Sequence, residues 1–174
     1  MSIGHLTVET DGAELWNPKP EWRRLDSALV LNLPRLQPIQ RELITPLNLL
    51  LSGIVEDNKS QVHSGAYRLA GLGQGLTPAG DDVLMGLLYG LWVWRLDRDL
   101  MQLIVETAVP RTTTLSGAFL WAAMEGEASI HWHNLIYNGL QAVDQILSIG
   151  ATSGRDAWTG FTHLGHRLAG KLPN

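Results

Sequence analysis

Residues 71–94 read Gly71-Leu-Gly-Gln-Gly-Leu-Thr-Pro-Ala-Gly-Asp-Asp-Val-Leu-Met-Gly-Leu-Leu-Tyr-Gly-Leu-Trp-Val-Trp94, a glycine-rich stretch that runs into a long apolar segment. The apolar segment, residues 83–94, follows two aspartates and ends before Arg95. It is too short to cross a bilayer, which takes roughly 20 residues. We therefore expect a buried helix at the centre of the fold, covering residues 78–96.

Apolar residues recur at helical spacing from residue 39 almost to the end of the chain. Many of the 18 glycines fall inside the expected helices, among them Gly86 and Gly160, which predicts closely packed helices. The expected fold class is mainly α, a compact multi-helix bundle formed by residues 38–174. Besides residues 78–96, helices are expected around residues 43–54 and over 62–69, 100–109, 114–124, 133–149 and 153–168.

Residues 1–37 have a different pattern. Leu6 and Val8 are followed by polar residues, a turn is expected at residues 11–12, and residues 13–16 could return as a second strand. We expect a small β-like and otherwise irregular N-terminal segment attached to the helical core. The whole chain of 174 residues fits a single domain.

Composition narrows the class of protein. The formal net charge is −4 and the basic residues form no cluster, which argues against a nucleic-acid binder or a protein of anionic membrane surfaces. Charged residues make up 17%, below the usual quarter, so we expect part of the surface to be covered by a second copy or by partner subunits. Cysteine is absent and the chain begins without a secretory signal pattern, which predicts a cytoplasmic protein.

The glycine-rich stretch before the central helix is the strongest candidate for a functional site. Glycines let a ligand approach the backbone, and a helix start offers unpaired N–H groups to a phosphate or carboxylate. Thr77 is expected to cap the helix and Pro78 to be its first residue. Asp81 and Asp82 are the expected catalytic residues, and they could also hold a cation such as Mg²⁺. The expected ligand-binding residues here are Gly73, Gln74, Gly75, Thr77 and Gly80. The alternative is an ordinary glycine-rich turn whose two acids only complement the helix dipole.

Two further helix starts are rich in hydroxyl groups. At the later one, Ser153 is expected to cap the last helix, with Asp156 completing a capping box. Arg155 and Arg111 could each bind an anion through the guanidinium group. These helix starts and the glycine-rich stretch could converge on one small anionic metabolite, although all of them could equally be plain caps. The additional ligand-binding candidates are Arg111, Thr113, Ser116, Thr152, Ser153, Gly154, Arg155 and Asp156.

Residues 71–86 resemble the Gly-Leu-Gly-x-Gly-Leu-Thr-Pro-Ser-Gly-Asp-Asp-x-Leu-x-Gly signature of a bacterial family of domains of unknown function. That family includes the AllH subunit associated with oxamate carbamoyltransferase of allantoin breakdown. Residues 112–116 with 125–127, and residues 150–160, also resemble it, so the resemblance covers about residues 65–170. Gln74 stands where the family usually has proline, and Ala79 where it often has serine. The resemblance implies carbamoyl transfer, with carbamoyl phosphate as one substrate and with partner subunits.

Two hypotheses follow. In the first, the chain is an enzyme or enzyme subunit whose three motifs form one pocket for a small phosphorylated or carboxylated metabolite. In the second, it is a non-catalytic binding or assembly subunit, in which the glycines pack helices and the acids cap them.

Overall fold

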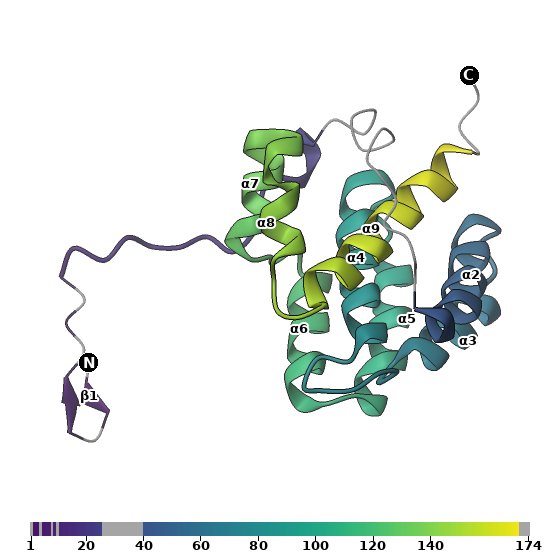
Figure 1. Cartoon of the computed structure of the whole chain (residues 1–174), viewed down its shortest axis with the longest axis horizontal. Helices are drawn as coiled ribbons and strands as arrows, with labels where there is room; N and C mark the ends of the chain where they lie inside the picture. Colours follow the sequence, from purple (N-terminus) through teal and green to yellow (C-terminus); the bar gives the residue numbers. More distant parts are fainter. Residues whose placement is uncertain (1, 4, 8, 10, 26–39, 171–174) are drawn as a thin grey trace.

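The computed structural model describes residues 2–3, 5–7, 9, 11–25 and 40–170. Figure 1 shows that most of them form helices packed side by side. The long helices are α2 (Arg41–Val55), α3 (Lys59–Leu69), α4 (Ala79–Trp94), α5 (Arg98–Ala108), α6 (Thr114–Met124) and α9 (Ser153–Ala169). The shorter elements are β1 (Ser2–Ile3), β2 (Leu6–Thr7), η1 (Trp22–Arg24), η2 (Val109–Arg111), α7 (Ile130–Asn138), η3 (Gly139–Ala142) and α8 (Val143–Leu147). The predicted fold class, mainly α, is confirmed.

Helix α4 lies at the centre, as its apolar sequence predicts, and crosses α9 at unusually short range. A Cβ atom added to Gly86 of α4 would lie 1.7 Å from the carbonyl oxygen of Ala157, and one added to Gly160 of α9 would lie 2.0 Å from that of Val83. Glycines on both helices therefore let the two backbones touch. This contact holds the start of α9 beside the start of α4.

The close crossing makes Gly160→Ala a costly substitution. We expect it to lower the free energy of unfolding by about 3 kcal/mol, because the added methyl group meets backbone atoms and the helices must move apart. Gly117→Ala in α6 is the matched control, since its added Cβ would lie 3.4 Å from the Val109 side chain. That variant should be unchanged or up to about 1 kcal/mol more stable, from helix propensity. Urea unfolding measures both, and equal losses would contradict the account.

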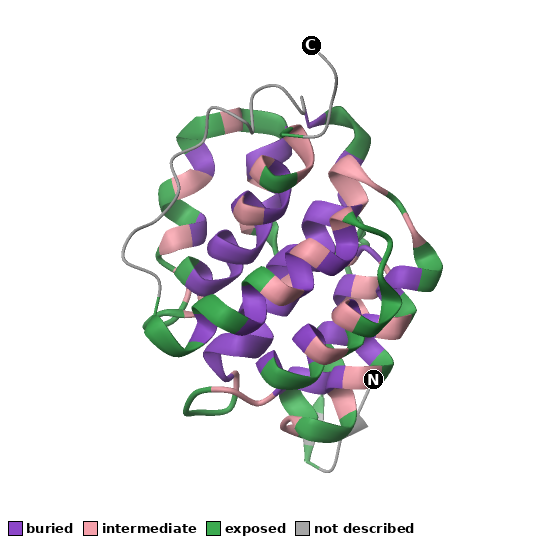
Figure 2. Ribbon diagram, turned by 90° about the vertical axis from the view of Figure 1, so that its right-hand side faces the viewer, coloured by how far each residue is buried: buried purple, intermediate pink, exposed green. Residues whose placement is uncertain are grey.

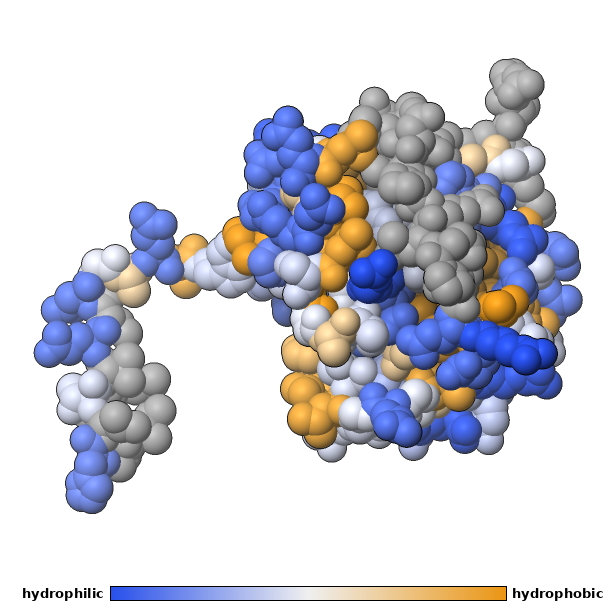
Figure 3. All heavy atoms as spheres, viewed as in Figure 1, coloured by the Kyte–Doolittle hydropathy of each residue, from blue (hydrophilic) through white to orange (hydrophobic). Residues whose placement is uncertain are grey.

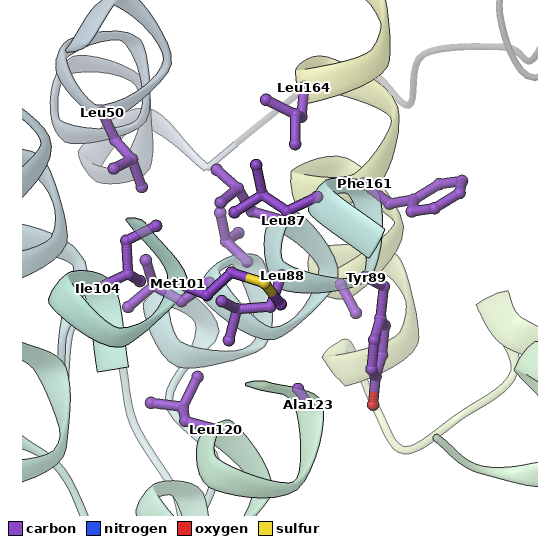
Figure 4. Close-up of a cluster of buried hydrophobic side chains, with 14 of the residues drawn as sticks. Leu50, Leu87, Leu88, Tyr89, Met101, Ile104, Leu120, Ala123, Phe161 and Leu164 are labelled. Atoms are coloured by element: carbon purple, nitrogen blue, oxygen red, sulfur yellow. The ribbon is translucent and has the colours of Figure 1, made fainter. Parts of the chain in front are cut away.

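The core lies between α4 and the helices around it. Figure 4 shows Leu50 of α2, Leu87 and Leu88 of α4, and Ile104 of α5 pointing into it. Figure 2 shows the same organisation along whole helices, with buried faces turned inward and exposed faces outward. Among the described residues, no helix is long and apolar enough to cross a membrane.

Side-chain caps begin several helices where the sequence has polar breaks. Asn58 accepts a hydrogen bond from the Gln61 N–H group at 3.2 Å, at the start of α3. Asp97 accepts one from the Leu100 N–H group at 3.0 Å, at the start of α5. These contacts satisfy donors that a helix start otherwise leaves unpaired.

The expected β-like N-terminal segment is not supported beyond a short ladder. The sequence predicts a hairpin that turns at residues 11–12. In the structure, residues 13–16 form no strand, and Leu15 is fully exposed. The only pairing among the described residues is the two-residue ladder of β1 with β2. A two-stranded hairpin of this length is marginally stable at best on its own. Val8 and residues 26–37 of this expected segment lie outside the described residues.

Residues 133–149 form two short helices and not the one long helix expected. Gly139 has a φ of +61°, which ends α7, and η3 leads from there into α8. A left-handed backbone conformation is open to glycine at little cost, so this residue provides the break.

The N-terminal segment joins the bundle at Pro18 and Trp22. The Ala128 N–H group donates to the Pro18 carbonyl oxygen at 2.8 Å, and Trp22 Nε1 donates to the Gly126 carbonyl oxygen at 2.9 Å. The Trp22 ring stacks on Tyr89, with ring centroids 5.0 Å apart. These contacts place Pro18 over the region where α4, α6 and α7 meet.

Candidate functional site

A cavity of about 400 Å³ lies where the starts of α4 and α9 face α6 and α7. Its polar lining comes from Thr77, Asp82, Glu127, Ser129 and Ser153. The rest of the lining is mostly apolar and includes the side chains of Met85, Tyr89, Phe119, Trp132 and Ala157. A mostly apolar cavity with a small number of polar groups is the usual form of a small-molecule site.

Helical periodicity brings these side chains to the cavity. Asp82, Met85 and Tyr89 follow one another at intervals of three and four residues, so they share a face of α4. On α9, Ser153 and Ala157 are four residues apart and share a face in the same way. The close α4–α9 crossing turns these two faces toward each other.

Asp82 is the polar centre of the site. Only 4% of the residue is exposed to solvent, and its Oδ2 atom has no hydrogen-bond partner among the described residues. The Thr77 and Ser153 hydroxyl oxygens lie 3.2 Å apart, within hydrogen-bonding distance, and both interact with the Asp82 carboxyl group. A buried carboxyl oxygen without a hydrogen-bond partner lowers the stability of the fold, and this oxygen is available to accept a hydrogen bond from a ligand.

Burial raises the pKa of the Asp82 carboxyl group from 3.8 to about 7. The Ser153 and Thr77 hydroxyl groups act against this rise in pKa, whereas the negative charges of Asp156 and Asp81 add to it. Burial, with a smaller effect from the Asp82 charge, also raises the pKa of the Tyr89 hydroxyl group. Asp82 can therefore take up or release a proton near neutral pH, as a general base or acid must.

The carboxylate group of Asp81, the neighbouring acid, is hydrogen-bonded to other protein groups. Its Oδ1 atom accepts a hydrogen bond from the Gly71 N–H group at 2.9 Å. Its Oδ2 atom accepts bonds from the hydroxyl groups of Thr112 and of Ser116, the latter at 2.9 Å. Both carboxylate oxygens are thus in use, and Asp81 ties the glycine-rich stretch to the start of α6.

The described part of the chain contains no group of three or more His, Asp or Glu side chains placed to hold a metal ion. Of the two acids expected to bind Mg²⁺, only Asp82 has a carboxylate oxygen without a protein partner.

The N-caps of both helices differ by one residue from those expected, one residue later at α4 and one residue earlier at α9. Pro78, not Thr77, is the N-cap of α4, and Thr152, not Ser153, is the N-cap of α9. The hydroxyl groups of Thr77 and Ser153 are therefore not used as caps, and they meet each other beside Asp82. The Thr152 hydroxyl group interacts with Asp156 instead.

Asp156 lies close enough to Asp82 to act on it electrostatically, but its carboxyl group does not line the cavity. The Gln40 side-chain amide donates to it at 3.2 Å. Burial raises the pKa of Asp156, against the lowering effects of Thr152, Gln40 and the Arg155 charge. The Arg155 residue itself is exposed and outside the lining.

The glycine-rich stretch provides the turn before α4. Gly73, Gln74 and Gly75 are exposed and lie outside the cavity lining. The Gly80 N–H group donates to the Leu72 carbonyl oxygen at 2.8 Å. At the start of α4, this donor is therefore already used by the protein.

Two other candidates, Arg111 and Thr113, also have contacts away from the cavity. The Arg111 guanidinium group lies 3.5 Å from the centroid of the Tyr67 ring and donates to the Tyr67 carbonyl oxygen at 3.0 Å. Thr113 caps α6 through the Ser116 N–H group at 3.1 Å and donates to the Leu76 carbonyl oxygen at 2.5 Å. The structure thus brings Thr77, Asp82, Ser153 and Gly154 together at the cavity and places the other candidates around them.

The aromatic residues of the cavity lining, and the acidic residue Glu127, are not predicted from the sequence. Tyr89 and Met85 could have been found from their spacing to Asp82 on one helix. Phe119, Trp132 and Glu127 come from segments whose placement depends on the tertiary fold, and apolar residues of this kind are typical of any core.

The family comparison covers the part of the chain that forms most of the cavity. Residues 69–164, more than half of the chain, match the family model described as oxamate carbamoyltransferase subunit AllH. This span contains every lining residue of the cavity except Pro18. No solved structure matches the chain. The chain belongs to the AllH family of oxamate carbamoyltransferase subunits.

Proposed function

We propose that the cavity is a substrate site of an oxamate carbamoyltransferase, in which Asp82 binds the amide group of oxamate and accepts a proton from it. The observation that carries this proposal is the Asp82 carboxyl group, which is buried and has one oxygen without a protein partner. The family's name supplies the reaction.

The polar end of the cavity suits an amide group. A carboxylate oxygen accepts a hydrogen bond from an amide N–H group, and the Thr77 and Ser153 hydroxyl groups can donate to the carbonyl oxygen beside it. The start of α9 lies at the same end, where the helix dipole favours the carboxylate of oxamate. The apolar walls around Tyr89 and Trp132 exclude water, which strengthens these interactions.

The chemistry needs a proton acceptor, because an amide nitrogen is a weak nucleophile. The oxamate nitrogen attacks the carbamoyl carbon of carbamoyl phosphate, and a new C–N bond forms. The C–O bond to phosphate breaks, and phosphate leaves with the bonding electrons. The proton lost by the nitrogen passes to the Asp82 carboxylate, whose pKa of about 7 suits this transfer.

A second candidate function is a non-catalytic assembly subunit. The observation that favours it is the exposed apolar surface of α6, which includes Leu115, Phe119 and Trp121. An apolar surface of this kind is typical of a subunit interface. The two candidates differ in whether turnover depends on Asp82.

Asp82→Asn tests the proposal in the assembled enzyme. We expect kcat/KM for carbamoyl transfer to oxamate to fall at least about 100-fold, because asparagine cannot accept the proton. Asp144→Asn, at an exposed position of α8, is the matched control and should keep the wild-type rate. Wild-type kcat/KM should also fall as the pH drops through about 7, where Asp82 becomes protonated. Assembled Asp82→Asn enzyme with a rate within threefold of wild type would favour the assembly subunit.

A further inference from the structure

The cavity has the wrong charge to hold anionic substrates by itself. Its described lining contains two acids, Asp82 and Glu127, and no Lys, Arg or His. The two arginines expected to serve here are directed elsewhere, since Arg111 stacks on Tyr67 and Arg155 lies outside the lining. Oxamate and carbamoyl phosphate both carry negative charge, and a buried anion needs a partner of opposite charge.

The cavity is also larger than these substrates require. Cavities of roughly 300–1,000 Å³ usually bury a drug-sized ligand, whereas oxamate has only a few non-hydrogen atoms. Phe119 lines the cavity and is 45% exposed at the surface of the molecule, and we call the part of the cavity beside it the outer cavity. Oxamate and carbamoyl phosphate are both small and polar, so neither supplies an apolar group for the outer cavity.

The apolar lining continues onto the outer surface of α6. Leu115 lies one turn before Phe119 on the same helix face and is 42% exposed, and Leu76 beside the start of α6 is also exposed. We call Leu76, Leu115 and Phe119 the docking face. Figure 3 shows apolar surface gathered over this part of the molecule.

We infer that another subunit of the carbamoyltransferase binds the docking face, fills the outer cavity with an apolar side chain and brings a basic side chain toward Glu127 and Asp82. The inference rests on the proposed function, which supplies the anionic substrates. Charge complementarity selects the partner, because a second copy of this chain, with its formal net charge of −4, would add negative charge beside a cavity that is already lined by two acids. The cation that neutralises the substrate thus comes from the neighbouring subunit.

Substitutions on the docking face test this interaction. The chain is co-expressed with the other subunits of the carbamoyltransferase, and their association is measured by co-purification and titration. We expect Phe119→Asp and Leu115→Asp each to weaken association at least about tenfold, because a charge replaces a buried apolar contact. Leu115 does not line the cavity, so its variant leaves the substrate site intact. Ile44→Asp on α2 is the control at equal exposure, 41%, and should associate normally.

The outcomes separate this inference from the proposed function. Normal association of both docking-face variants overturns the inference, and loss of turnover in Asp82→Asn then still supports the function. A homodimer of the chain that Leu115→Asp dissociates, with no binding of the other subunits, also overturns it. Loss of association in Leu115→Asp together with full turnover in Asp82→Asn overturns the proposed function and leaves the docking face standing.

Discussion

Asp82→Asn is expected to make the isolated chain more stable at pH 8, by up to about 4 kcal/mol in the free energy of unfolding. The pKa of Asp82 is raised from 3.8 to about 7 in the folded state, so between these pH values the folded chain binds more protons than the unfolded chain. Stability of the wild type therefore falls as the pH rises through this range, and the loss is complete above pH 7. Asparagine is neutral at every pH and avoids this cost.

Urea unfolding at pH 8 and at pH 4 measures the effect. The advantage of Asp82→Asn should nearly vanish at pH 4, where the wild-type carboxyl group is mostly protonated. Asp144→Asn should stay within about 0.5 kcal/mol of wild type at both pH values, as exposed substitutions usually do. If Asp82→Asn is no more stable than wild type at pH 8, the ionised Asp82 carboxylate does not destabilise the folded chain, which would contradict the account.

A gain in stability together with a loss of turnover is the signature of a functional residue. Buried charges that destabilise a fold are retained where the chemistry requires them. The same substitution would then separate the two roles of Asp82 in one protein.

Asp81→Asn is expected to have the opposite effect, a loss of about 2–4 kcal/mol. The Asp81 carboxylate accepts hydrogen bonds from the Gly71 N–H group and from the Thr112 and Ser116 hydroxyl groups. An asparagine NH₂ group would face donors and leave at least one buried donor without a partner, which costs about 1–3 kcal/mol beside the lost charge-assisted bonds. The same urea experiment at pH 8 measures it.

Ser116→Ala is the control for the Asp81 contacts. It removes one donor and leaves two, so its loss should be smaller, about 1 kcal/mol. If Asp81→Asn costs less than Ser116→Ala, the carboxylate does not hold the glycine-rich stretch to α6.

The sequence predicts the helices best where local signals agree. The helix expected over residues 114–124 is α6, whose sequence has a capping threonine before it and a glycine after it. The break at Gly139 was missed, because a glycine inside a helical pattern does not show by itself whether it takes a positive φ.

The candidate site is predictable only in part. Convergence of the two helix starts was one of the hypotheses, and the structure brings Thr77 and Ser153 together. Asp81 and Asp82 have the same chemistry in sequence, and what separates them is the pair of hydroxyl donors at Thr112 and Ser116, far along the chain. The catalytic and ligand-binding roles of these residues stay predictions.

The most direct test of the central claim is the pKa of Asp82 in the isolated chain, measured by ¹³C NMR titration of the aspartate carboxyl carbons and assigned with Asp82→Asn. A carboxyl group held in an apolar substrate cavity should titrate at about 7. An Asp82 carboxyl group that titrates at about 4, like an ordinary exposed aspartate, would contradict the account.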